Sequence, residues 1–278
     1  MIKLFASDLD GTLLKNGRLD EVVFETINKV LEQNKVFVIA TGRLMFEEHI
    51  KSMKLDQYDV FVICLNGALV FDSKRNEIYK KQIDSVFLKN VLSEFQDIPF
   101  EFITTDKILI QQSKEKFREY VRDNELRSKK LPEKALNLYM ENCRFKVSLE
   151  EIIETGVLKI NGHINDKKRF RNFRLFLDEN AEFVENCPFE NNDFFEITDS
   201  SVNKGNSLLK LIDYLGVSEN EVAVYGDGPN DMKMLKMFKN SFAPKNATRE
   251  VLEVASKIVG ACDEHGVPKH INKLITTE

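Results

Sequence analysis

The sequence is poor in several features that mark well-known protein classes. It has only four cysteines among 278 residues, and no two of them form a C-x-x-C pair, so the spacing supports neither a zinc cluster nor a disulfide framework. They are Cys64, Cys143, Cys187 and Cys262. No apolar run is long enough to span a bilayer, and Asp8 and Asp10 interrupt any signal-peptide core near the first residue. We therefore expect no membrane association and a reducing, cytoplasmic compartment.

An excess of positive charge is also missing. The formal net charge is -5, which argues against non-specific attraction to nucleic acid. The basic stretch KKRFRNFRLF could suggest RNA binding, but Phe170, Phe173 and Leu177 fall on one helix face and leave the charges on a solvated one. Neither G-x-G-x-x-G nor G-x-x-x-x-G-K-[ST] occurs, so dinucleotide and P-loop chemistry have no support. Small-molecule chemistry is the better hypothesis.

The chain instead alternates short apolar runs with amphipathic segments. IKLFA, KVFVIA and DVFVICL read as buried strands, and residues 21–34 between the first two read as a helix that Asn34 stops. The pattern returns in KGNSLLKLIDYLG and EVAVY, where the helix ends at Gly216. Strands that are apolar on both faces and alternate with helices predict a parallel sheet covered on both sides.

Between residues 83 and 190 the pattern changes to alternating strands such as EFITTDKILIQQ, mixed with charged helices. This predicts an inserted α+β domain. We therefore expect an α/β protein, with a doubly wound Rossmann-like parallel sheet formed by residues 1–82 and 191–278 and an insertion at 83–190.

Aspartates follow two of the predicted strands. Asp8 and Asp10 follow the first, and Asp227 and Asp231 follow EVAVY, with Asn230 between them. Each pair has a simpler explanation, as a D-G turn or as a helix N-cap. Together, however, four aspartates would converge at the carboxyl ends of parallel strands, where open α/β sheets bind ligands, and that many hard oxygen ligands favour Mg²⁺.

Two further residues would complete a phosphate site. Thr41 ends a third strand and offers a hydroxyl to phosphoryl oxygens. Lys204 stands at the start of a helix, where both its ammonium group and the helix dipole favour an anion, although most lysines are simply solvated. A carboxylate such as Asp8 can attack phosphorus, and a second acid such as Asp10 can protonate the leaving oxygen and later activate water.

The motifs DLDGT, ATGR, NKG and GDGPND occur in the order and approximate spacing of the four motifs of the haloacid dehalogenase-like superfamily. The chain resembles its Cof-type subgroup over nearly its whole length, and Asn66 in LNGALV matches that subgroup's N-G-A step. The resemblance implies that the inserted domain is a cap that closes over the substrate.

The resemblance also implies residue roles, with a small phosphorylated metabolite as the partner and Mg²⁺ as the cofactor. Asp8 would be the nucleophile and Asp10 the acid and base, while Thr41 and Lys204 would hold the phosphoryl oxygens. The metal ligands would be Asp8, Asp10 through its backbone carbonyl, Asp227 and Asp231. The residues expected to bind the phosphate or line the pocket are Gly42, Arg43, Asn66, Gly67 and Asn230.

One loop departs from the subgroup's pattern. Where the subgroup reads M-G-N-A, this chain reads P-K-N-A, with Pro244 and Lys245 replacing the first two residues and Asn246 retained. The sequence thus predicts a Mg²⁺-dependent phosphatase of small phosphate monoesters, with sugar phosphates as the leading class ahead of nucleotides and pyridoxal phosphate, acting as a monomer or homodimer. A phosphomutase and a non-catalytic phosphometabolite sensor are the alternatives.

Overall fold

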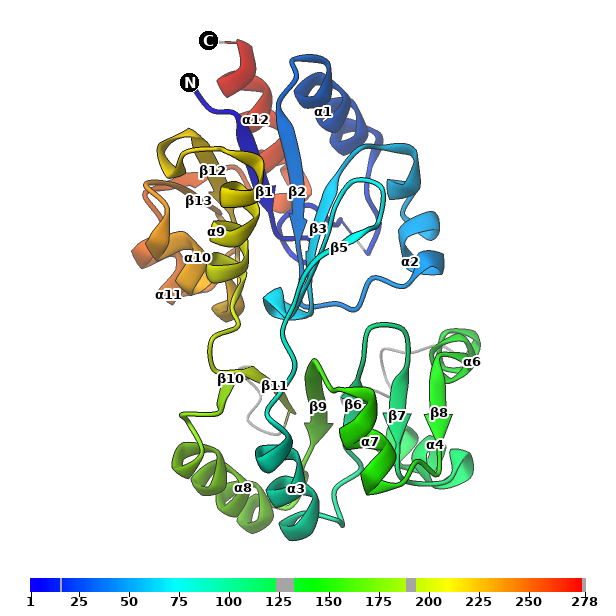
Figure 1. Ribbon diagram of the computed structural model, residues 1–278. Coiled ribbons are helices and arrows are strands. Elements are labelled where there is room, and N and C mark those ends of the chain that lie inside the picture. The colour runs from blue at the N-terminus through cyan, green and yellow to red at the C-terminus, as the bar shows by residue number, and fades with distance from the viewer. Residues whose placement is uncertain (16, 124–132, 189–193, 277–278) are drawn as a thin grey trace. The chain divides into compact units, whose positions relative to one another are not determined.

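The computed structural model describes residues 1–15, 17–123, 133–188 and 194–276. The chain forms two compact units, a core unit made of Met1–Lys80 and Val202–Glu278 and a cap unit made of Lys81–Ser201. Each unit contains its own sheet, and the core sheet is largely parallel with helices beside it (Figure 1). The protein is therefore of the α/β class, as the sequence predicts.

The core unit is built on an eight-stranded sheet in the order β14-β13-β12-β1-β2-β3-β4-β5. The strands are β1 (Leu4–Ser7), β2 (Val36–Ala40), β3 (Phe61–Cys64), β4 (Leu69–Phe71), β5 (Glu77–Lys80), β12 (Val222–Tyr225), β13 (Asn240–Pro244) and β14 (Lys257–Val259). The first six in that order run parallel, and β4 and β5 add an antiparallel edge. The four predicted strands β1, β2, β3 and β12 are thus present and parallel, and the sheet has four further strands.

The central strands of this sheet are buried throughout, because helices cover both of its faces. The helices are α1 (Glu21–Glu32), α2 (Glu47–Ser52), α9 (Lys204–Leu215), α10 (Met232–Met237), α11 (Arg249–Val254) and α12 (Gly266–Thr276), with short 3-10 turns η1 (Leu55–Gln57), η2 (Leu65–Gly67), η3 (Glu219–Glu221), η4 (Pro229–Asp231) and η5 (Cys262–Glu264). The side chains of Leu4 and Ala6 pack in one cluster with Leu208 of α9. Helix α1 packs beside α12.

Two helix ends agree with the sequence prediction. Asn34 follows α1 in a left-handed conformation at φ 55°, and Gly216 caps α9 at φ 65°. The left-handed conformation is most accessible to glycine and asparagine, so the residue type at each of these two positions explains why the helix ends there.

The cap unit has a six-stranded sheet in the order β10-β11-β9-β6-β7-β8. Its elements are α3 (Ser85–Glu94), β6 (Glu101–Ile103), β7 (Ile108–Ile110), α4 (Lys114–Asp123), α6 (Glu133–Glu141), β8 (Cys143–Phe145), α7 (Leu149–Thr155), β9 (Lys159–His163), α8 (Lys167–Glu179), β10 (Val184–Pro188) and β11 (Phe194–Asp199). All pairings except β7 with β8 are antiparallel. In α8 the side chains of Phe173 and Leu177 are buried and Phe170 packs beside them, which agrees with the predicted apolar face.

The second boundary between the units differs from the prediction. The sequence places residues 191–201 in the core, but β11 pairs with β9 and β10 and so belongs to the cap sheet, and the boundary falls after Ser201. The first boundary falls after Lys80, two residues before the predicted one.

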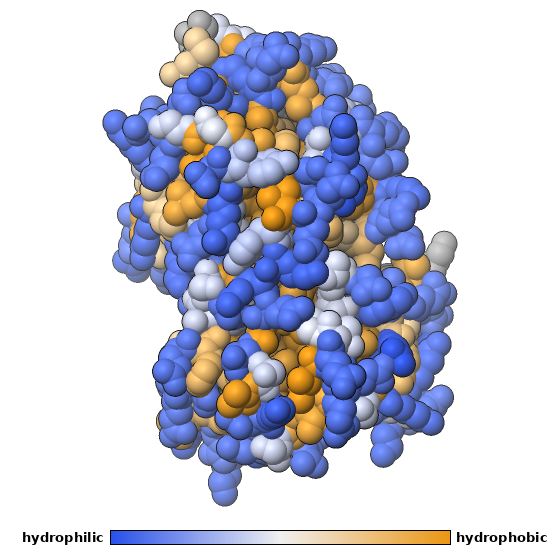
Figure 2. All heavy atoms as spheres, viewed as in Figure 1, coloured by the Kyte–Doolittle hydropathy of each residue, from blue (hydrophilic) through white to orange (hydrophobic). Residues whose placement is uncertain are grey.

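The surface of the molecule is mainly polar on the face in Figure 2, where apolar residues form small separate groups. Among the residues described, no helix combines the length and apolarity needed to cross a lipid bilayer. The thiols of Cys64, Cys143 and Cys262 donate to the backbone carbonyl oxygens of Leu69, Tyr139 and Leu14, respectively.

Candidate active site

The parallel strands β1 and β12 place two of the predicted aspartates side by side. Ser7 lies opposite Tyr225 in the register, and the backbone N–H of Asp8 donates to the carbonyl oxygen of Tyr225 at 3.0 Å. Asp227 follows two residues after Tyr225. Both carboxylates therefore leave the sheet at the same edge, which the sequence predicts from the strand pattern.

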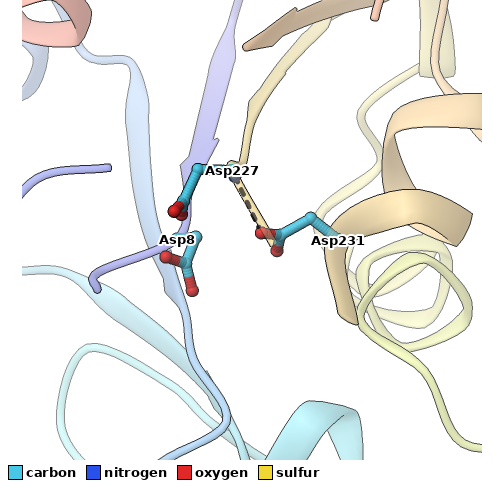
Figure 3. Close-up of side chains that lie close together, drawn as sticks. All are labelled: Asp8, Asp227 and Asp231. Carbon is cyan, nitrogen blue, oxygen red and sulfur yellow. Dashed lines mark hydrogen bonds between the residues drawn. The ribbon is translucent and has the colours of Figure 1, made fainter. Parts of the chain in front are cut away.

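Asp8, Asp227 and Asp231 form an acidic cluster, whose side chains converge in Figure 3. One carboxylate oxygen from each lies within 4.8 Å of the others. Asp8 and Asp231 are buried and Asp227 is half-buried. The second oxygen of Asp231 accepts hydrogen bonds from the backbone N–H groups of Asp227 and Gly228, each at 3.0 Å, so this carboxylate also fixes the loop after β12.

Lys204 balances part of this charge. Its side chain is fully buried, and Nζ lies 2.6 Å from Oδ1 of Asp8 and 2.7 Å from Oδ1 of Asp231. The lysine is the first residue of α9, whose N-cap is Asn203, which accepts a hydrogen bond from the N–H of Asn206 at 2.9 Å. The capped helix end thus determines where the ammonium group lies.

The electrostatics of the cluster favour an additional cation. Burial raises the pKa of Asp8 well above its usual value, and although Lys204 opposes this shift, the charges of Asp231 and Asp227 add to it. Burial also raises the pKa of Asp227 to about 6. Burial alone would lower the pKa of Lys204, but the charges of Asp231 and Asp8 outweigh it and raise that pKa. Three carboxylates against one ammonium leave net negative charge in a buried place.

Two neighbouring residues hold the cluster in shape. The hydroxyl of Thr12 donates to Oδ1 of Asp227 at 2.8 Å. Gly11 has φ +80°, and an ideal Cβ there would lie only 2.1 Å from Oδ2 of Asp227. The sequence interpretation did not single out Thr12, although it is the last residue of the DLDGT motif and that motif was the available signal.

Asp10 lies apart from the acidic cluster. Its side chain is exposed and forms a two-point ion pair with Arg43, in which Nε donates to Oδ2 at 2.6 Å and the terminal nitrogen donates to Oδ1. The structure therefore brings two predicted site residues together in a contact that the sequence did not indicate. The acid and base role of Asp10, and the metal contact of its carbonyl, stay predictions.

The remaining predicted residues meet across three loops. Thr41 directly follows β2 and is buried, and its hydroxyl accepts from the backbone N–H of Arg43 at 3.2 Å. Asn230 of η4 donates to Oδ1 of Asn66 in η2 at 3.0 Å, and a Cβ on Gly42 would lie 2.7 Å from that same oxygen. The loops after β2, β3 and β12 are thereby packed directly against one another.

Gly67, the last residue of η2, packs against the start of α9. It has φ +110°, and its carbonyl oxygen accepts a hydrogen bond from Ser207 Oγ at 2.6 Å. Only glycine fits easily there, because an ideal Cβ would lie 2.6 Å from the carbonyl oxygen of Asn203.

The loop that departs from the subgroup's pattern still reaches the site. Pro244 ends β13, and Nδ2 of Asn246 donates to the carbonyl oxygen of Gly11 at 2.8 Å while its Oδ1 accepts from the N–H of Cys262 at 2.8 Å. Asn246 therefore ties the loop of Gly11 to the segment before α12.

An α/β core with an inserted cap unit and an acidic cluster at its strand ends is the architecture that the motifs predict. The chain belongs to the haloacid dehalogenase-like hydrolase family, whose model matches residues 5–271. It is a phosphatase of that family.

Relatives and solved structures agree with this assignment. The chain is 25% identical over 288 residues to the 5-amino-6-(5-phospho-D-ribitylamino)uracil phosphatase YwtE of Bacillus subtilis, covering 99% of each chain. It is 25% identical over 295 residues to the phosphatase YwpJ of the same organism, covering 99% of this chain and 100% of that one. Among solved structures, the HAD subclass IIB sugar phosphatase BT4131 superposes with a TM-score of 0.75 at 21% identity and 98% coverage of each chain, which shows a shared fold.

Proposed function

We propose that this phosphatase is Mg²⁺-dependent and hydrolyses small phosphate monoesters, with sugar phosphates as the leading class, through an aspartyl-phosphate intermediate on Asp8. The observation that carries the proposal is the acidic cluster at the strand ends with the ammonium group of Lys204 between Asp8 and Asp231. Such a site combines a carboxylate nucleophile with hard oxygen ligands. A cytoplasmic location and a monomer or homodimer stay predictions from the sequence.

The cluster suits a divalent cation. Asp8, Asp227 and Asp231 would hold Mg²⁺. Burial raises the pKa of Asp8 and that of Asp227, and the single ammonium group of Lys204 does not compensate three closely placed carboxylates. When bound, the ion would neutralise charge on the transferring phosphoryl group. Thr12 and the backbone N–H groups of Asp227 and Gly228 would keep the ligands oriented.

In the proposed reaction an oxygen of Asp8 attacks phosphorus, so that an Asp8 oxygen–phosphorus bond forms while the bond from phosphorus to the leaving oxygen breaks. Asp10 gives its proton to that leaving oxygen. It later takes a proton from water, whose oxygen bonds to phosphorus while the Asp8 oxygen–phosphorus bond breaks and inorganic phosphate leaves. Lys204 holds Asp8 in place throughout, since its Nζ already contacts Oδ1 of Asp8 at 2.6 Å. Because the Asp10 carboxylate pairs with Arg43, this role requires the pair to open in the turnover cycle.

The substrate class rests on chemistry and on relatives. The name of YwtE describes a phosphate monoester on a ribityl chain, and BT4131 is named as a sugar phosphatase. Both names fit a phosphate ester of a small polyhydroxylated molecule. At this level of identity we propose the class for this chain, and not one compound.

The test is release of free phosphate from a panel of sugar phosphates, nucleotides and pyridoxal phosphate, with Mg²⁺ or with EDTA. The wild type should release phosphate only with Mg²⁺, and Asp8→Asn should lose this activity. The exposed cap residue Asp178 provides a matched control, since Asp178→Asn makes the same chemical change elsewhere.

Two other outcomes would replace the proposal. An isomerised sugar phosphate without net phosphate release would indicate a phosphomutase. Saturable binding of panel members without turnover, by a folded and Mg²⁺-loaded protein, would indicate a phosphometabolite sensor.

A further inference from the structure

A concave region lies at the edge of the core unit, in a part of the chain that the proposed reaction does not use. It is a groove of about 470 Å³ between the edge strand β14 and helix α12. This volume falls within the range of small-molecule sites, roughly 300–1,000 Å³.

Positive side chains line part of the groove. It is lined by Lys257 of β14 and by Lys269, His270 and Lys273 of α12, against the single carboxylate of Glu264. Three ammonium groups around one groove contrast with a chain whose net charge is -5. An anion placed among these ammonium groups would gain Coulomb energy from each of them.

The charges of two of these lysines converge on His270. Burial lowers the pKa of His270, and the nearby charges of Lys257 and Lys273 lower it further. These lysines come from different elements, one from the sheet edge and one from the helix. An anion in the groove could therefore contact both.

The walls of the groove are fixed by the backbone. Gly266 packs so closely on the preceding segment that an ideal Cβ there would lie 1.7 Å from the carbonyl oxygen of Gly260. The N–H of Gly266 also donates to the carbonyl oxygen of Ala261 at 2.9 Å. The turn that connects β14 to α12 is thus closely packed, and a rigid wall loses little conformational freedom when a ligand binds.

The groove also offers apolar surface and hydrogen-bonding groups. Ile258, Val259 and Leu274 contribute to its lining, and β14 is the last strand of the sheet, with no further strand beside it among the described residues. His270 Nδ1 lies 3.0 Å from the hydroxyl of Tyr225. When that hydroxyl donates to Nδ1, the other ring nitrogen carries a proton that an anion can accept.

From these observations we infer that the groove between β14 and α12 is a second ligand site, separate from the acidic cluster, for a small anion with at least two negative charges, such as a phosphorylated metabolite. Its ligand would lie against His270, which contacts Tyr225 at the end of β12, and the carbonyl oxygen of Tyr225 accepts the N–H of Asp8. A change at His270 on binding would thus reach the strand end at Asp8 through Tyr225.

The test is an NMR titration of the histidine-labelled full chain with inorganic pyrophosphate, in EDTA and without Mg²⁺. The chain has only four histidines, so the imidazole signals can be assigned by substitution. The His270 signal should shift saturably, and the double variant Lys257→Gln/Lys273→Gln should weaken the apparent affinity by about tenfold or more, because each lysine lost removes a charge-assisted contact.

Lys54→Gln is the matched control, since it removes the charge of an exposed core-unit lysine that does not line the groove. A His270 shift that rises linearly with pyrophosphate, or that persists unchanged in the double variant, would overturn the inference. So would a shift that depends on protein concentration and not on pyrophosphate, because it would indicate that a second copy of the chain covers the groove. None of these readouts uses turnover, so they are independent of the proposed function.

Discussion

At the scale of single residues, the site depends on how closely charged groups are packed. Lys204 is fully buried between Asp8 and Asp231. Removing the lysine, or removing its carboxylate partners, would leave an uncompensated charge in the interior. The loop of Gly11 approaches so closely that Oδ2 of Asp227 occupies the space of a Cβ. The same packing that organises the site therefore makes it sensitive to one added methyl group.

Gly11→Ala should abolish phosphate release, whereas Gly17→Ala should not. Both glycines have positive φ, +80° and +75°, so each substitution should cost about 1–2 kcal/mol of backbone strain. Only at Gly11 does the new Cβ meet Asp227, since nothing lies within 4 Å of a Cβ at Gly17. Denaturant unfolding and phosphate release for both variants check this. Equal activity in the two variants would show that the contact with Asp227 has no part in catalysis.

At the scale of elements, helix and strand ends place the reactive groups. Asp8 and Asp227 follow adjacent parallel strands, and Lys204 begins α9 directly after its N-cap. Catalytic geometry is then a consequence of where the elements stop. Loss of the N-cap of α9 should therefore lower the rate of the reaction, even though it reduces the free energy of unfolding only slightly.

Asn203→Ala should destabilise the protein by about 1 kcal/mol, because it removes the side-chain acceptor for the N–H of Asn206. It should also lower kcat about tenfold, since Lys204 loses its fixed position beside Asp8. Ser148→Ala removes the equivalent cap of α7 in the cap unit and provides the control. A similar loss of stability with full activity is expected there. The same full activity in Asn203→Ala would contradict the positioning role of the cap.

The contact of α12 with β12 should make stability depend on pH. The pKa of His270 is lowered from 6.5, so the unfolded chain binds this proton more readily than the folded one. The contribution of His270 to stability is therefore complete above pH 6.5 and is lost as the pH falls through 6.5 toward the folded-state pKa.

An NMR titration of the His270 imidazole, together with unfolding curves over the same pH range, measures this effect. Lys257→Gln/Lys273→Gln should raise the His270 pKa and reduce the loss of stability, because both lysines add to the shift while Tyr225 contacts the ring as a neutral group. A pKa at or above 6.5 in the wild type would contradict the expected sign.

Local signals explain which parts of the structure could be predicted. Periodicity and left-handed end residues predicted α1 and α9 with their stops at Asn34 and Gly216. The aspartates could be placed together because parallel strands end at one edge of a sheet. The sequence pattern did not place β11 in the cap sheet, because its pairings with β9 and β10 form only when the chain folds back on itself.

Side-chain partners far apart in the sequence also lay beyond prediction. Thr12 donates to Asp227 across 215 residues, and Asp10 pairs with Arg43 from another loop. Both contacts depend on rotamers that are set only when the loops pack. A motif could indicate which residues gather, but not which of them touch.

At the scale of the whole molecule, the two units have separate hydrophobic cores. Phe173, Phe195 and Phe100 belong to the core of the cap unit, whereas Leu4, Val224 and Leu208 belong to one in the core unit. The acidic cluster lies entirely in the core unit, because all three of its aspartates come from that part of the chain. Ligand binding at the cluster should therefore stabilise one unit more than the other.

Mg²⁺ should slow hydrogen exchange in the core unit and leave exchange in the cap unit nearly unchanged. A ligand that binds only the folded state stabilises by about 2.7 kcal/mol at a hundred times its dissociation constant, and this gain reaches only segments that open together with the site. Exchange measured by mass spectrometry with Mg²⁺ or EDTA should show protection in β1, β12 and α9 and little in β9 and α8. Asp231→Asn removes one proposed ligand and should reduce the protection. Equal protection of both units would mean that they unfold as one, so that the separate cores seen in the structure act together.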